Sequence, residues 1–168
     1  MLVFLGIGNG GGALVLDANV ELFVTDVDAS KLANFCLRLN TSDPELAVRF
    51  VRGQKMRSVE ALFDEVSSAF QFPYYFGENW AALDECIRDL SWISSKRFLL
   101  VIGKFESVLN QDVPARKVFG SVLRAAIVEM EKEGRSLQIV VQCSSIDSLC
   151  TNNIFGANEF SSAVLTIS

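Results

Sequence analysis

Residues 73–92, PYYFGENWAALDECIRDLSW, are the stretch that decides the fold. The stretch opens as an aromatic-rich loop in which Pro73 and Gly77 are turn residues, and Asn79 follows where a side-chain oxygen can cap a helix. Beyond this cap, apolar residues recur at the spacing of one buried helical stripe: Trp80, Leu83, Ile87 and Leu90. These residues therefore predict a loop followed by an amphipathic helix.

The other side of this expected helix is polar. At about 100° per residue, four positions fall together away from the apolar stripe: Ala81, Asp84, Glu85 and Arg88. Acidic residues opposite a core stripe usually form a solvated surface, and patterning alone favours that interpretation. Two adjacent carboxylates on a rigid helix can also face a partner, so the patterning leaves both possibilities open.

The run Pro-x-Tyr-Phe-Gly-Glu-Asn-Trp-x-Ala-Leu-x-x-Cys, which begins at Pro73, resembles the loop and second helix of the barstar family. An aromatic and glycine pattern of this length is a fairly specific signal. The family consists of intracellular inhibitors of barnase-type ribonucleases. The resemblance implies that the acidic helix and the aromatic loop enter the active site of a small basic nuclease, where the carboxylates replace the RNA phosphate.

The same resemblance implies which residues contact the partner. Tyr75 matches the family's loop aromatic, and Gly77 and Asn79 match its loop glycine and cap asparagine. Glu85 stands at the dominant carboxylate and is one methylene longer than the usual Asp, while Glu129 aligns with a further contact carboxylate on a long helix. The predicted partner-binding residues are Tyr75, Phe76, Gly77, Asn79, Ala81, Asp84, Glu85, Arg88 and Glu129.

Two positions depart from the family pattern. Ala81 stands where the family has an Asp that contacts the enzyme, and Asp84 replaces an interface Trp. The loss of one anion and one aromatic anchor should weaken binding to barnase itself. The partner could then be a related ribonuclease or a different toxin domain, with this chain as the immunity protein of a bacterial toxin. Alternatively, the chain is a regulatory or scaffolding module that has lost inhibition.

Composition favours a binding protein over an enzyme. The 168 residues, of which 50% are hydrophobic and 21% charged, suffice for one ordinary domain with a real core. A net charge of −5 argues against binding nucleic acid through its phosphates and suits a basic partner instead. The chain contains no histidine, the residue that most often performs acid and base catalysis near neutral pH.

We expect no metal, no cofactor and a cytoplasmic location. The four cysteines form no C-x-x-C pair, which favours reduced thiols: Cys36, Cys86, Cys143 and Cys150. The apolar N-terminus, residues 1–7, lacks a basic segment and is too short for a signal peptide or a membrane span. We therefore expect no membrane association.

The first 45 residues carry a glycine motif whose meaning is less direct. Gly6, Gly8 and Gly11 spell G-x-G-x-x-G after an apparent strand, which suggests a nucleotide-binding enzyme. That site needs a helix after the third glycine, whereas the following residues resemble strands. A glycine-rich hairpin loop in a small antiparallel meander is the favoured interpretation. Residues 32–39 fit either a helix or a strand.

The remaining pattern predicts an α/β fold. Ser58 is expected to cap a helix that ends at Phe70, and a loop containing Pro114 is expected to precede a long helix stopped by Gly134. Apolar runs predict strands at 46–51, 97–102 and 137–141. A strand, a long helix and a second strand form a crossover unit, so we expect a three-stranded, mainly parallel sheet packed by helices, as in barstar.

Three segments are expected along the chain. Residues 1–45 would be an N-terminal β-rich extension, 46–143 the barstar-like domain, and 144–168 a C-terminal tail. Within the tail, residues 163–167 could form an edge strand that pairs with the N-terminal meander.

Overall fold

A computed structural model describes residues 2–5, 16–146 and 162–167. The strands are β1 (Leu2–Leu5), β2 (Leu22–Thr25), β3 (Leu46–Arg52), β4 (Arg97–Gly103), β5 (Ser136–Gln142) and β6 (Ser162–Ile167). The helices are α1 (Ala29–Ser42), α2 (Val59–Phe70), α3 (Trp80–Asp89) and α4 (Val113–Lys132), with 3-10 turns at Gly53–Lys55 and Phe105–Ser107. None of the helices in the described ranges has the length and apolar character that crossing a membrane requires.

The described strands form one six-stranded sheet in the order β1-β6-β2-β5-β4-β3. Every neighbouring pair is parallel, including the expected pair β4 and β5. The prediction of a three-stranded sheet is therefore wrong, and so is the antiparallel N-terminal meander. Strands β1 and β2 pair with β6 and β5, which lie far along the chain, and local patterning carries no signal for such pairing.

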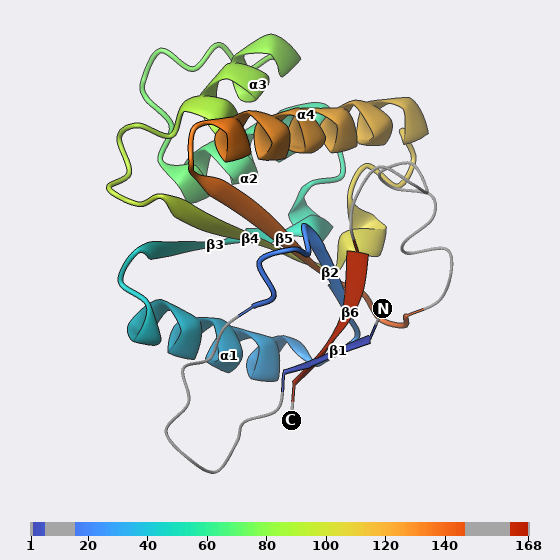
Figure 1. The fold of residues 1–168 in the computed structure, drawn as a ribbon. Helices are drawn as coiled ribbons and strands as arrows, with labels where there is room; N and C mark the ends of the chain where they lie inside the picture. The colour runs from blue at the N-terminus through green and yellow to red at the C-terminus, as the bar shows by residue number, and fades with distance from the viewer. Residues whose placement is uncertain (1, 6–15, 147–161, 168) are drawn as a thin grey trace.

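The sheet lies between two helical layers, with α1 on one face and α2, α3 and α4 on the other (Figure 1). Strand β4 shows why its residues 98–102 are all apolar. Phe98, Leu100 and Ile102 belong to the core beneath α2, α3 and α4, whereas Leu99 and Val101 belong to the core against α1. Because both faces of the strand are covered, all five of these side chains are buried, as the apolar run predicted.

Residues 32–39, whose pattern fitted either a helix or a strand, lie in a helix. Residues 29–42 form helix α1, capped by the Asp28 carboxylate, which accepts hydrogen bonds from the backbone N–H groups of Ser30 and Lys31 at 3.0 Å. The buried residues of α1 follow helical spacing: Leu32, Phe35, Cys36 and Leu39. The expectation of a β-rich N-terminal segment is corrected accordingly, because a helix of 14 residues occupies a third of it.

The helix ends on the opposite face mostly agree with the prediction. Ser58 caps α2, since its hydroxyl accepts the Ala61 N–H at 3.2 Å. Pro114 was expected in a loop but lies in the first turn of α4, where a missing N–H leaves no bond unmade. Helix α4 ends at Lys132, and Gly134 follows with a φ of +70° that a glycine accommodates without strain.

The C-terminal segment was expected at the edge of the sheet and lies inside it. Strand β6 pairs with both β1 and β2, and Ala163 and Leu165 are buried against the α1 side. The sheet thus crosses the boundaries expected at residues 45 and 144, while the division into three segments stays a prediction. Gly6, Gly8 and Gly11 lie outside the described residues, as does Cys150.

Candidate functional site

The candidate site is α3 with the loop before it, above the helical layer of α2 and α4 (Figure 1). The Asn79 side chain accepts the Ala82 N–H at 3.0 Å and donates to the Gly77 carbonyl at 3.0 Å, so it ties the loop to the first helical turn. On the inner side, Leu83, Cys86 and Ile87 are buried. The cap and the apolar stripe that the sequence predicted are both confirmed.

An aromatic cluster supports the loop from below. Phe72 packs edge-on against Phe76, with ring centroids 5.0 Å apart, and against Trp92 at 5.9 Å. Phe63 packs edge-on against Trp80 at 5.1 Å, and Trp92 donates its indole N–H to a backbone carbonyl of α2 at 2.9 Å. Such contacts hold rings in fixed orientations. Phe76, a predicted partner contact, is half-buried among these rings.

Two tyrosines project from the loop into solvent. Tyr75 is 64% exposed and Tyr74 is completely exposed, and their rings pack edge-on with centroids 5.8 Å apart. Exposed aromatic rings of this size are frequent anchors in protein interfaces. Tyr75 was assigned from the sequence, whereas Tyr74 was not, because it occupies an unspecified position of the motif.

The two adjacent carboxylates of α3 differ in their surroundings. Glu85 is exposed, and its carboxylate makes no ion pair or hydrogen bond within the described part of the chain. Asp84 is half-buried and forms an ion pair with Arg88 one turn later. Ala81 is exposed on the same side. The structure therefore leaves Glu85 available to a partner while Asp84 is already engaged.

Helix α4 contributes the remaining predicted carboxylate. Glu129 accepts a hydrogen bond from the Lys132 ammonium at 3.0 Å, and this bond, followed by the charges of Lys132 and Arg88, holds the pKa of Glu129 below its usual range. Figure 1 shows α3 and α4 packed side by side.

A second arginine fixes the C-terminal end of α3. Arg135, between α4 and β5, donates hydrogen bonds to the backbone carbonyls of Arg88 at 2.6 Å and Asp89 at 2.5 Å. A cation at this end also complements the helix dipole. The sequence offered no signal for this contact, because the two segments are distant along the chain.

Two further exposed carboxylates line a hollow beside the loop. A shallow hollow of about 380 Å³ lies between α2 and the loop, lined among others by Asp64, Gln71, Tyr74 and Glu78. The carboxylates of Asp64 and Glu78 are exposed and form no ion pair among the described residues. A basic surface docking on α3 would therefore meet further negative charge beside the tyrosines.

On the opposite face, a second hollow of about 270 Å³ lies between α1 and the ends of β3 and β4. It is mainly apolar, and Arg52 and Lys104 also line it. Within the described residues, no three acidic or cysteine side chains gather as a metal site requires.

Comparisons with known proteins agree with the motif. The family model described as Barstar (barnase inhibitor) matches residues 46–142, which confirms the resemblance. No curated protein sequence matches.

Among solved structures, the fold is similar to chains of the Drosophila ORC bound to GC-rich DNA and Cdc6, with a TM-score of 0.54 at 13% identity over 87% of this chain and 48% of that one. The complex with AT-rich DNA and Cdc6 gives a TM-score of 0.54 at 13% identity, over 89% of this chain and 51% of that one. This chain therefore spans about half the length of both of these chains. The structure of Drosophila ORC bound to DNA gives a TM-score of 0.51 at 11% identity, over 88% of this chain and 82% of that one. At these identities the likeness concerns the fold alone.

Proposed function

This chain belongs to the barstar family of barnase inhibitors, and from that premise we propose that it binds and blocks a small basic ribonuclease or a related toxin domain. The helix α3 and the loop before it enter the active site of the nuclease. The chain acts from the cytoplasm as the immunity protein of a bacterial toxin, with no catalysis of its own and no contact with nucleic acid or membrane.

The observation that carries the proposal is the setting of Glu85. Its carboxylate is exposed and makes no ion pair among the described residues, and it stands on a helix held at both ends by Asn79 and Arg135. A preorganised anion of this kind meets a preformed cationic cleft without having to be ordered on binding. The net charge of −5 steers a basic partner toward the surface.

Binding through Glu85 also requires no existing ion pair among the described residues to be broken. Binding through Asp84 would require its ion pair with Arg88 to break or to be shared with the partner. Glu85 exchanges only water for the cationic groups of the nuclease, and charge-assisted hydrogen bonds are the strong ones. The exposed Tyr75 ring, in the loop before α3, supplies apolar contact area.

The direct test follows RNA cleavage. Several small basic ribonucleases, barnase among them, are mixed with a micromolar excess of this protein, and the cleavage of a fluorescent RNA is recorded. We expect at least one nuclease to be inhibited with a stoichiometry of one to one. Unchanged cleavage throughout the panel would contradict the proposal.

A variant identifies the residue responsible. Glu85→Ala should weaken binding to the inhibited nuclease by about 100-fold, because a desolvated cationic group in the cleft then lacks its partner. Glu45→Ala is the matched control, since it removes an exposed carboxylate and the same charge at the start of β3. Calorimetric titration measures both affinities. Equal affinities of the two variants would remove Glu85 from the site.

A second function is favoured by one observation. Ala81 carries no charge where the family has a contacting Asp, and Asp84, which replaces an interface Trp, is engaged by Arg88. A regulatory or scaffolding module that has kept the fold would show this pattern. The neighbouring reading frame separates the two functions: a toxin-like frame favours immunity, and a gene without one favours the module.

A further inference from the structure

Arg88 lies one helical turn after Asp84 on α3. Its guanidinium forms an ion pair with the Asp84 carboxylate, and its Nε donates to the Asp84 carbonyl at 3.3 Å. The Arg88 side chain is nevertheless 41% exposed, more than the 27% of Asp84. A guanidinium has more N–H donors than these two bonds use, so Arg88 still presents donors to solvent.

The charge of Arg88 also reaches the neighbouring helix. It contributes to the lowered pKa of Glu129, whose main cause is the hydrogen bond from Lys132. The carboxylates of Asp84 and Glu129 are each in an ion pair, with Arg88 and with Lys132, whereas Glu85 forms no ion pair among the described residues.

We propose that Arg88 is a specificity-determining residue of the docking surface. It withdraws Asp84 from the partner and offers its own N–H groups in place of that carboxylate. The inference rests on the proposed function and concerns which nuclease that surface accepts.

The spacing of the two charges describes the partner. Glu85 and Arg88 are three residues apart on one helix, so their Cβ atoms lie roughly 5–6 Å from each other. The complementary nuclease has a cationic group opposite Glu85 and, beside it, a carboxylate or carbonyl acceptor opposite Arg88. A cleft that is uniformly cationic meets a like charge at Arg88 and is discriminated against, which is how interfaces exclude wrong partners.

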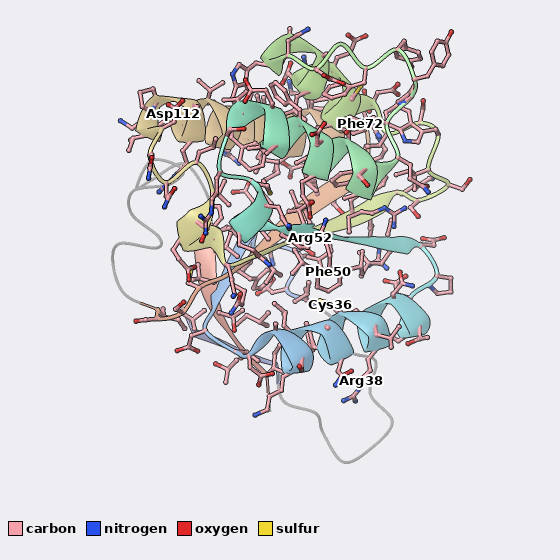
Figure 2. All side chains as sticks on the ribbon, turned by 180° about the vertical axis from the view of Figure 1, so that it is seen from behind. Cys36, Arg38, Phe50, Arg52, Phe72 and Asp112 are labelled. Carbon is pink, nitrogen blue, oxygen red and sulfur yellow. The ribbon has the colours of Figure 1, made fainter. Side chains whose placement is uncertain are left out.

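The test compares two variants of equal charge. Arg88→Gln removes the cation from the surface, and Arg38→Gln removes one from α1 on the far side of the sheet, as Figure 2 shows for Arg38. For ribonucleases with uniformly cationic clefts, we expect Arg88→Gln to associate about three to ten times faster than Arg38→Gln at low salt. The difference should shrink at high salt, where exposed charges are screened.

A double variant tests whether Arg88→Gln acts by releasing the Asp84 carboxylate or by changing the structure of the helix. If Arg88→Gln acts partly by releasing Asp84, the gain should be smaller when Asp84→Asn is also present, and a double-mutant cycle measures this coupling. A gain of the same size with and without the Asp84 carboxylate would overturn the inference that Arg88 withdraws Asp84 from the partner. Circular dichroism of every variant reports whether α3 stays folded.

The outcomes distinguish this inference from the function on which it rests. If the wild-type chain inhibits a nuclease but Arg88→Gln and Arg38→Gln bind every panel member equally, the specificity role of Arg88 is wrong and the inhibitor function stands. If neither the wild type nor any variant binds a nuclease, the proposed function fails and the inference fails with it.

Discussion

A single ion pair separates the roles of two adjacent carboxylates on α3. Asp84 contacts Arg88 and is shielded by it, whereas the neighbouring Glu85 faces solvent. Elsewhere on the surface, Glu65 and Arg52 form a bidentate pair, with Nε to Oε1 at 2.7 Å and Nη2 to Oε2 at 2.8 Å. Glu65 also accepts the Arg52 backbone N–H at 2.9 Å, so this pair joins α2 to the end of β3.

The Glu65 contact predicts a dependence of stability on pH. The side-chain hydrogen bond from Arg52 is the main cause that lowers the pKa of Glu65 below its ordinary value of 4.5. A lowered folded-state pKa means that the stabilisation is present above pH 4.5 and is lost as the pH falls through the folded-state value. When the pH is lowered from 6 to 3, the free energy of unfolding of Glu65→Gln should therefore decrease less than that of the wild type.

Urea unfolding at both pH values measures this difference. Asp64→Asn is the control, because it removes a carboxylate from the same helix that is exposed and forms no ion pair among the described residues. A pH dependence of Glu65→Gln as steep as that of the wild type would show that the pair contributes nothing.

At the level of elements, α3 is a short helix held rigidly in place. Asn79 caps its N-terminus, Arg135 binds the carbonyls at its C-terminus, and the aromatic cluster of Phe72, Phe76 and Trp92 supports the loop that leads into it. An isolated helix of 10 residues would be marginal in water. The precise presentation of Glu85 therefore depends on contacts at both ends.

The N-cap can be tested alone. Asn79→Ala should lower the free energy of unfolding by about 1 kcal/mol, because the first turn of α3 loses its side-chain acceptor. Asn79→Asp keeps the acceptor but loses the hydrogen bond to the Gly77 carbonyl, so it separates the cap from the loop contact. Chemical denaturation ranks the three proteins, and a wild-type midpoint for Asn79→Ala would argue against the cap.

At the level of the whole molecule, two cores on opposite faces of one sheet stabilise the fold. The N-terminal and C-terminal segments both enter that sheet: β6 lies between β1 and β2, and β2 joins them to β5. Consequently the part that matches the family model shares its sheet with strands outside the match. The core against α1 depends on residues from both ends of the chain.

Leu165→Ala tests this integration. Leu165 is 1% exposed in β6, and a Leu to Ala change at such a position typically costs about 2–4 kcal/mol. If the sheet unfolds as one unit, fluorescence of Trp80 and Trp92 on the opposite face should report the lowered stability. An unchanged transition at these tryptophans, with early loss of the β6 region, would instead indicate that residues 46–143 fold independently.

Much of the fold could be predicted from residue order because the relevant interactions are local. The caps at Ser58 and Asn79 act within one turn, the buried stripes repeat at helical spacing, and an apolar run such as 97–102 indicates a strand covered on both faces. The family motif placed Tyr75 and Glu85 at exposed positions for the same reason, since loop and helix are contiguous.

Two features required the folded chain. The places of β1, β2 and β6 in the sheet depend on burying both of its faces at once, and the strands that meet there come from opposite ends of the sequence. The Asp84–Arg88 pair lies within one helical turn, but the anchoring of α3 by Arg135 depends on how α3 packs against α4 and the turn after it. Side-chain charge can be read from residue type, but whether a charge is free or neutralised depends on which neighbours packing brings within a few ångströms.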